Sequence, residues 1–404
     1  MKYSKEEVIQ YVNEEDVKFV RIAFCDVFGR QKNVSIMSDE LERAFEYGIA
    51  FDASSITGFG NEAHSDLFLH PEPETFTLLP WRPEHGSVAR MFSTITYPDG
   101  RIFECDTRSL LKKAVEDAKE AGYVFRFGAE QEFYLFKLDD EGEPTSIPYD
   151  RAGYMDIAPD DKCENIRREI CLMLEQVGIK PESSHHEDGP GQNEIDFRYS
   201  DALTAADNVE TFQTVVKVIA QRNGLAADFS AKPLPDRPGN GFHINMSVVS
   251  GEEEVLDRMI AGVLDKIREM TIFLNPYDNS YARFGQSRAP GYVSWSRENR
   301  SQLIRIPAAE GPFRRAELRS PDPTANPYLS FALIIYAALE GIKRQILLPP
   351  AVDRNLFQVA DTELRGLERL PDSPDTARIL ARESAFIKEH IPESIRRIYC
   401  DERC

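Results

Sequence analysis

The feature that most constrains this chain is a short segment, residues 185–194, in which two glutamates flank a Gly-Pro-Gly turn. Glycine tolerates left-handed backbone torsion angles and proline fixes its own φ, so this turn favours a tight reversal of the chain. The reversal brings Glu187 and Glu194 to one side. Because hard divalent cations such as Mg²⁺ prefer carboxylate oxygens, the segment predicts a metal site. A polar hairpin with solvated acids is the alternative.

A second pair of acids lies in the segment 123–138, which is rich in phenylalanine and is expected to be a strand. Glu130 and Glu132 are two residues apart, so they face the same side of that strand. Two acids buried among aromatic residues repel each other unless a cation lies between them. We therefore expect both to bind metal, with a solvent-facing strand surface as the alternative.

His243 follows a glycine-rich stretch, 238–241, and opens an expected strand at 243–250. The glycines allow a ligand to approach the backbone closely. From the start of the strand, the imidazole can reach a site at that end of the sheet. The alternative is a histidine that only hydrogen-bonds within the fold.

Arginines gather late in the chain, although the formal net charge of the protein is −20. They lie at positions 297, 300, 305, 314, 315 and 319. Glu317 is two residues before Arg319 and shares its strand face. Guanidinium groups hold phosphates and carboxylates by paired hydrogen bonds, so this cluster predicts an anion site. A salt-bridged structural strand is the alternative.

Composition narrows the function classes. A length of 404 residues favours two domains, and the acidic charge argues against nucleic acid or anionic membranes as partners. No apolar run is long enough for a membrane helix, and the N-terminus has no apolar signal core. The six cysteines show no metal-binding spacing, and Cys400 and Cys404 are expected to be free thiols at a frayed terminus. A cytoplasmic location is expected.

The order of expected elements is that of an α+β protein. Residues 1–100 are expected to form one small domain and residues 101–404 a second. Helices are expected at 4–13, 38–47, 106–122, 159–177, 202–224, 252–275 and 326–343. Strands are expected at 17–27, 31–36, 75–79, 87–96, 123–138, 193–199 and 243–250. The Arg-, Pro- and Gly-rich stretch 276–323 is long and irregular, which is typical of a functional segment.

These segments, in this order, resemble the glutamine synthetase family, class I type, along nearly the whole chain. The resemblance rests on several blocks of sequence, namely 51–56, 128–133, 185–194, 232–233, 239–243, 299–307 and 315–328. It implies an N-terminal β-grasp domain and a C-terminal catalytic domain of curved antiparallel strands with helices. It also implies a homo-oligomer, a dodecamer of two stacked hexameric rings, with active sites between neighbouring subunits.

The resemblance also implies roles for individual residues. One Mg²⁺ or Mn²⁺ would be held by Glu132, Glu187 and Glu194, and a second by Glu130, His243 and Glu317, with two or three ions in each site. ATP would be bound by Asn245, Arg300, Arg305 and Arg315. The acid substrate would be bound by Gly239, Arg283 and Arg319. Asp52 would reach into a neighbour's site to bind ammonium, and would be catalytic together with Arg300 and Arg305.

The implied reaction is ATP-dependent. A carboxylate, most simply that of glutamate, attacks the γ-phosphate and becomes an acyl phosphate, and ammonia then displaces phosphate to form an amide. Ligation of glutamate to an organic amine, or of another acid, is the first alternative. A non-catalytic structural relative is the second, and a metal-dependent hydrolase on an unrelated fold is the third.

Three positions depart from the family pattern. Pro238 stands where the family has an asparagine that grips the amino-acid substrate. The segment 284–288 is one residue shorter than the family's mobile flap, and Arg288 stands where the flap has a glutamate. Phe357 stands where adenylylated relatives have tyrosine. The first two departures motivate the organic-amine alternative.

Overall fold

The N-terminal hairpin forms where the sequence predicted it. The computed structural model describes residues 3–60, 65–82, 85–249, 255–286, 288–309, 311, 314–360 and 362–401. In it, β1 (Val17–Cys25) pairs antiparallel with β2 (Gln31–Met37). The helix α1 (Lys5–Glu14) precedes them and begins at Ser4, whose side chain forms a capping box with Glu7. The chain divides into two units, residues 1–110 with 175–178 and residues 111–174 with 179–404.

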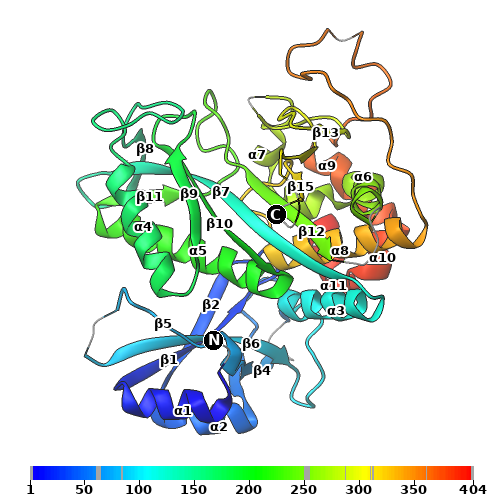
Figure 1. Ribbon diagram of the computed structural model, residues 1–404. Helices are drawn as coiled ribbons and strands as arrows, with labels where there is room; N and C mark the ends of the chain where they lie inside the picture. The colour runs from blue at the N-terminus through cyan, green and yellow to red at the C-terminus, as the bar shows by residue number, and fades with distance from the viewer. Residues whose placement is uncertain are drawn as a thin grey trace. The chain divides into compact units, whose positions relative to one another are not determined.

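The first unit is built on a six-stranded sheet in the order β2-β1-β6-β4-β3, with β5 also paired to β6. The further strands are β3 (Ile49–Asp52), β4 (Asp66–Pro71), β5 (Thr77–Leu78) and β6 (Ser87–Thr96). β1 and β6 run parallel, whereas the other pairs are antiparallel. The helix α2 (Leu41–Tyr47) follows a short 3-10 turn, η1 (Ser38–Glu40), and η2 (Pro73–Thr75) precedes β5. Apolar residues of α1 and α2 are buried in this unit. Figure 1 shows the two helices, in blue, beside its strands.

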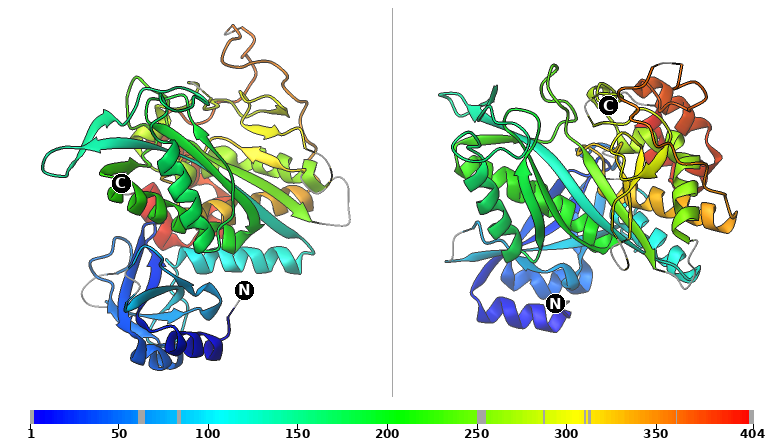
Figure 2. Two further views of the ribbon diagram at one scale, coloured as in Figure 1. Left: turned by 60° about the vertical axis from the view of Figure 1, so that its left-hand side comes forward. Right: turned by 45° about the horizontal axis from the view of Figure 1, so that its top comes forward.

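The second unit is built on a nine-stranded sheet in the order β13-β14-β15-β12-β7-β10-β9, with β8 and β11 also paired to β7. Its strands are β7 (Val124–Leu138), β8 (Pro144–Pro148), β9 (Pro181–His186), β10 (Gln192–Asp201), β11 (Leu225–Asp228), β12 (Phe242–Val249), β13 (Trp295–Arg297), β14 (Ile304–Ile306) and β15 (Ala316–Leu318). All pairs are antiparallel except β13 with β14. Figure 2 shows the long β7 beside β10 and β12.

Helices complete the second unit. They are α4 (Glu164–Gln176), α5 (Ala202–Arg222), α6 (Val255–Leu274), α7 (Asp278–Tyr281), α8 (Pro327–Lys343), α9 (Pro374–Glu383), α10 (Ala385–His390) and α11 (Glu393–Cys400), and α3 (Thr107–Glu120) leads into them. The backbones of α6 and α8 touch at Gly262 and Gly341. A Cβ atom on Gly262 would lie 2.2 Å from the Ala337 carbonyl oxygen. Only glycine allows so close an approach.

Strand alternation divides the large sheet into an apolar face and a polar face. On the apolar face, Phe127 of β7 stacks on Phe331 of α8, and Phe133 contacts Phe212 of α5. Residues 128, 130 and 132 of β7, which alternate with this set, therefore point away from the helices. The core lies between the sheet and α5, α6 and α8, and the opposite face is left free for polar chemistry.

Several expectations were wrong in their bounds. The helix expected from 159 begins only at Glu164, after a cis Ala158–Pro159 bond. The strands β3, β4 and β9 were not expected, and 75–79 is mostly a turn followed by the short β5. Cys400 is not at a frayed end but is a buried thiol of α11. Residues 250–254 of the expected strand and helix, and Cys404, lie outside the described residues.

Among the segments that the structure describes, none of the helices combines the length and the hydropathy that crossing a bilayer requires.

Candidate functional site

Pairing between strands places the predicted acids on the polar face of the large sheet. In the register of β10 on β7, Glu194 lies opposite Glu132 and Asp196 lies opposite Glu130. In the register of β12 on β7, His243 lies opposite Glu130. These pairs come from three neighbouring strands. The pairing of the strands brings the side chains together, although 113 residues separate Glu130 from His243 in the sequence.

The first group of metal-ligating atoms lies where the 185–194 hairpin meets the sheet. His185 Nε2 is 3.2 Å from a Glu194 carboxylate oxygen, and its Nδ1 is 3.5 Å from Glu187. Glu132, Glu194 and His243 form a neighbouring set whose ligand atoms lie within 4.8 Å of one another. The expected trio of Glu132, Glu187 and Glu194 is thus brought together, and His185 is an additional candidate that sequence reasoning missed.

The electrostatics of this group suit a divalent cation. Burial and the nearby Glu132 together raise the pKa of Glu187 to about 8. Burial and the facing Asp196 and Glu132 raise the pKa of Glu194 well above its ordinary value. Like charges held this close are unfavourable without a counterion, and carboxylate and imidazole donors are ligands that Mg²⁺ or Mn²⁺ accepts. The donor set therefore fits the predicted cation.

The second group comprises Glu130, His243 and Glu317, whose ligand atoms also lie within 4.8 Å of one another. His243 Nδ1 is 3.4 Å from Glu130 and 3.7 Å from Glu317. Burial alone would raise the pKa of Glu317, but Arg319, His243 and Arg305 together hold it at about 2. Glu317 is therefore ionised at neutral pH, as the predicted metal ligation requires.

Arginines surround the second group. Arg305 donates to Glu317 at 2.6 Å, and the fully buried Arg319 donates to the other oxygen of the same carboxylate. Arg315 donates through Nε to the Asn245 side-chain oxygen at 2.8 Å, and Asn245 donates to Glu130 at 2.6 Å. Arg300 is exposed on the wall of the same cavity. This cavity of about 840 Å³ is lined by the first group, by Glu130 and His243 of the second group, and by the predicted phosphate-binding arginines. Glu317 is fully buried behind its wall.

A second cavity, of about 400 Å³, adjoins the first and contains the residues predicted to bind the acid substrate. It is lined by Gly239, Arg283 and Lys232, and it shares Glu132, Glu187, His243 and Arg288 with the first cavity. Arg283 is buried, donates to the carbonyl oxygens of Ser320 and Pro321, and leaves its Nε without a partner. An unpartnered buried guanidinium N–H is suited to an incoming carboxylate. Arg319 lines the larger cavity instead.

A third cavity, of about 860 Å³, was not foreseen from the sequence. It shares Asn245 and Arg315 with the predicted ATP-binding set and Glu130 with the predicted metal ligands. It extends along Phe197, Tyr199 and Arg126. Aromatic and basic walls next to a phosphate site are suited to a nucleotide base. Tyr199 lies in β10, outside the acidic segment 185–194. It belongs to no motif, so sequence reasoning had no basis for selecting it.

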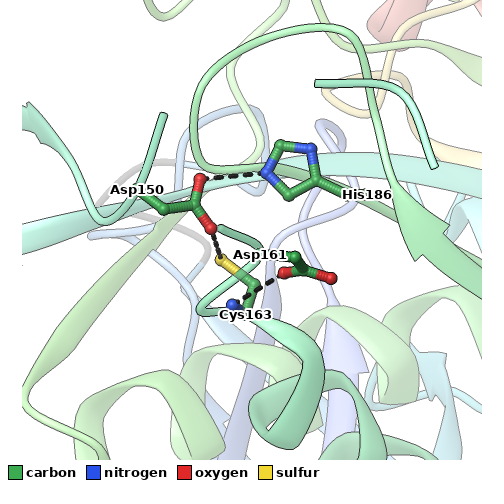
Figure 3. A group of neighbouring side chains, drawn as sticks. All are labelled: Asp150, Asp161, Cys163 and His186. Atoms are coloured by element: carbon green, nitrogen blue, oxygen red, sulfur yellow. Dashed lines mark hydrogen bonds and ion pairs between the residues drawn. The ribbon is translucent and has the colours of Figure 1, made fainter. Parts of the chain in front are cut away.

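A buried network anchors the metal-binding hairpin. The Asp150 carboxylate accepts hydrogen bonds from His186 Nε2 at 2.9 Å, from the Gly191 N–H at 2.9 Å and from the Cys163 thiol at 3.3 Å. Figure 3 shows Asp150 between His186 and Cys163, with Asp161 beside them. His186 Nδ1 faces the Glu187 carbonyl oxygen at 2.7 Å.

Charge makes this anchor stronger. Burial disfavours the charged form of both side chains. The hydrogen bond between them outweighs this effect: it raises the pKa of His186 and lowers the pKa of Asp150 to about 2. The pair is therefore ionic. Asp150 ties both sides of the turn, at His186 and Gly191, to the body of the unit. Sequence reasoning missed it, because a single aspartate 36 residues before His186 carries no local signal.

Asp52, the last residue of β3, belongs to the first unit and is exposed. Its carboxylate accepts from the Ser54 N–H at 2.9 Å, and this backbone hydrogen bond lowers its pKa. The predicted approach of Asp52 to a neighbouring subunit stays a prediction.

Comparisons with known proteins agree with this geometry. The family model described as glutamine synthetase, catalytic domain, matches residues 104–403, and the model described as glutamine synthetase, beta-Grasp domain, matches residues 16–98. The expected fold class is thereby confirmed.

Individual relatives match over nearly their full length. A glutamine synthetase of Clostridium saccharobutylicum is 44% identical, over 98% of this chain and 93% of its own. One from Methanosarcina mazei is 45% identical, over 97% and 91%. Among solved structures, a GmaS/ADP complex is 26% identical, with a TM-score of 0.87 over 96% of this chain and 92% of its own.

Proposed function

Because this chain belongs to the glutamine synthetase family, we propose that it is an ATP-dependent ligase that joins ammonia to the side-chain carboxylate of glutamate. The observation that carries the proposal is the set of six predicted metal ligands, Glu130, Glu132, Glu187, Glu194, His243 and Glu317, gathered on one face of the sheet between an acid cavity and an arginine-lined cavity.

Each cavity has a part in the reaction. ATP lies along the aromatic cavity, with its phosphates beside Arg315, Arg305 and Arg300. Glutamate lies in the smaller cavity with its α-carboxylate on Arg283, so that its side-chain carboxylate points to the shared wall. That carboxylate attacks the γ-phosphorus of ATP, ADP leaves, and an acyl phosphate forms. Ammonia then attacks the acyl carbon, phosphate leaves, and the nitrogen loses a proton.

The residues of the chain serve this sequence by position and charge. Arginines compensate negative charge on the transferred phosphoryl group, which is the largest electrostatic demand of phosphoryl transfer. Two Mg²⁺ or Mn²⁺ ions, one near Glu132, Glu187 and Glu194 and one near Glu130, His243 and Glu317, would supply further charge compensation when bound. Glu132 is oriented for this by the Gly241 N–H at 2.9 Å and the Gln192 amide at 3.0 Å.

The proposal includes the assembly. We expect a dodecamer of two hexameric rings in the cytoplasm, with Asp52 of one subunit binding ammonium in the site of the next, and with domains at 1–100 and 101–404. Light scattering after size exclusion tests the oligomeric state.

A second candidate is ligation of glutamate, or of another acid, to an organic amine. It is favoured by Pro238, which has no side-chain amide to hold a substrate amino group, and by Arg288 in the flap segment, which has no acid to take a proton from ammonium. A non-catalytic role is not favoured, since the predicted metal ligands and phosphate arginines are all present.

The test is phosphate release from ATP with Mg²⁺, first with glutamate and ammonia and then with glutamate and a panel of small amines. Release that depends on glutamate and is fastest with ammonia supports the first candidate. Release only with an amine or with a different acid supports the second. The absence of phosphate release under every combination would support the non-catalytic alternative.

A further inference from the structure

Arg288 places a guanidinium group inside a pocket of acids and an aromatic ring. Its Nε is 2.9 Å from one Asp188 oxygen and its Nη2 is 3.3 Å from the other, and Nη1 is 3.5 Å from Glu187. The guanidinium carbon lies 4.1 Å from the centre of the Tyr154 ring. Two carboxylates and a ring face are what a small organic cation requires of a binding site. In this protein, a side chain of the protein itself occupies that site.

The location of this pocket matters for the reaction. Arg288, Glu132, Glu187 and His243 line both the acid cavity and the phosphate cavity. They therefore form the wall at which the acid meets the phosphoryl group. The acyl carbon must react near this wall, so a nucleophile that attacks it passes close to the guanidinium.

The backbone holds Arg288 in this place. Its φ is +67°, a left-handed value that is unfavourable for a residue with a side chain. Its carbonyl oxygen accepts from the buried Arg319 at 3.4 Å, and the Ala289 N–H donates to the Gln286 carbonyl oxygen at 2.8 Å. Hydrogen bonds therefore hold the backbone at Arg288 and at Ala289.

The contacts of Arg288 do not depend on an empty metal site. A cation bound by Glu187 would compete with the 3.5 Å contact to that residue. The closer paired contact to Asp188, and the stacking on Tyr154, involve no predicted metal ligand. We therefore expect Arg288 to keep its position when a metal ion is bound, held by Asp188 and Tyr154.

We propose that Arg288 determines the class of nucleophile, by filling the acid–aromatic pocket with a resident cation and so disfavouring ammonium ions relative to amines that are uncharged at neutral pH. The inference rests on the proposed ligase function. An ammonium ion must bind before it loses the proton that frees its lone pair, so it must either displace Arg288 or approach it against like-charge repulsion. An amine that is already uncharged when it binds meets neither obstacle.

The test compares two small nucleophiles in the wild-type protein and in Arg288→Gln. Ammonium is positively charged at neutral pH, whereas hydroxylamine is uncharged and yields a hydroxamate that is measured by its colour with ferric ion. We expect Arg288→Gln to lower the KM for ammonium at least tenfold and to leave the KM for hydroxylamine within twofold. Arg288→Lys, which keeps the charge, and Arg168→Gln, on the exposed surface of α4, should behave as the wild type.

An unchanged or higher KM for ammonium in Arg288→Gln would overturn the inference. An equal fall for both nucleophiles would also overturn it, because it would indicate a steric effect. A calorimetric titration of the Mg²⁺-loaded protein with methylammonium decides the matter without turnover. Binding to Arg288→Gln but not to the wild type supports the inference, and equal binding to both refutes it.

Failure of the proposed function gives a different result. If the wild type forms no hydroxamate from glutamate and ATP, the ligase assignment fails, and the titration still tests whether Arg288 fills a cation pocket.

Discussion

Replacing Glu187 by glutamine should remove activity and, at the same time, make the metal-free protein more stable. The residue is 4% exposed, and this burial, together with the nearby Glu132, raises the pKa of the carboxylate from an ordinary value of 4.5 to about 8. Glutamine has almost the same shape but carries no charge. The substitution therefore removes the repulsion that a metal ion would otherwise relieve.

The sign and size follow from proton linkage. The pKa of Glu187 is higher in the folded state than in the unfolded chain, so the folded state binds more protons between about pH 4.5 and pH 8. The ionised carboxylate therefore destabilises the folded state. This destabilisation is absent below about pH 4.5, grows as the pH rises, and is complete above about pH 8. Raising the pKa from 4.5 to about 8 corresponds to at most ~5 kcal/mol. Relaxation of the open cavity and nearby Arg288 reduce this, and we expect about 1–3 kcal/mol.

The assay is urea unfolding of wild type and Glu187→Gln in EDTA, at a series of pH values from 5 to 9. The advantage of the variant should grow with pH and level off above about pH 8. Excess Mg²⁺ should stabilise the wild type and close the gap, and ATP turnover by the variant should be abolished with the assembly intact. Glu120→Gln, at the exposed end of α3, is the matched control and should show no such trend.

A stability difference that is absent at pH 8.5, or that shrinks as pH rises, would refute the electrostatic reasoning. Retained ATP turnover would refute the assignment of Glu187 as a metal ligand.

Three further predictions follow from the same structure. Removing Mg²⁺ with EDTA should lower the Tm more at pH 8 than at pH 6, because protons on Glu187 and Asp196, with pKa values of about 8 and 7, compete with the metal at the lower pH; an equal shift at both would contradict this. Asp150→Asn should weaken Mn²⁺ binding roughly tenfold to a hundredfold in a calorimetric titration by releasing the hairpin, whereas Cys163→Ala should change it little. Gly262→Ala should lower the free energy of unfolding by about 2–3 kcal/mol, because the added methyl group would lie 2.2 Å from the Ala337 carbonyl oxygen. An unchanged midpoint of urea unfolding would contradict this and would show that α6 and α8 can move apart without cost.

Sequence patterns predicted the polar face of the large sheet well, because its geometry follows from period-two alternation. Glu130 and Glu132 are two apart in β7, and their neighbours Phe127 and Phe133 are buried against helices. Placing His243 opposite Glu130 required the pairing of β12 with β7, which is a long-range contact that only the family resemblance implied.

The elements that sequence reasoning missed are those without a periodic or local signal. β9 is polar along most of its length, and it forms because β10 pairs with it beyond the Gly-Pro-Gly turn. Asp150 anchors that hairpin from a distant loop, and its role comes from burial rather than from any motif. The contacts of Arg288 also depend on tertiary structure, although the substitution of an arginine in this loop was visible in the sequence.

The division of the large sheet into two faces also determines which segments of this protein can accept insertions and substitutions. An insertion of one residue in β7 would turn Phe127 and Phe133 toward the metals and the glutamates into the core, so the phosphoryl-transfer half of the site tolerates almost no alteration of its strands. The loops that carry Pro238 and Arg288 are not bound by that alternation. New acids and new amines can therefore be acquired by exchanging loop residues, while the same strands continue to activate the same carboxylate chemistry.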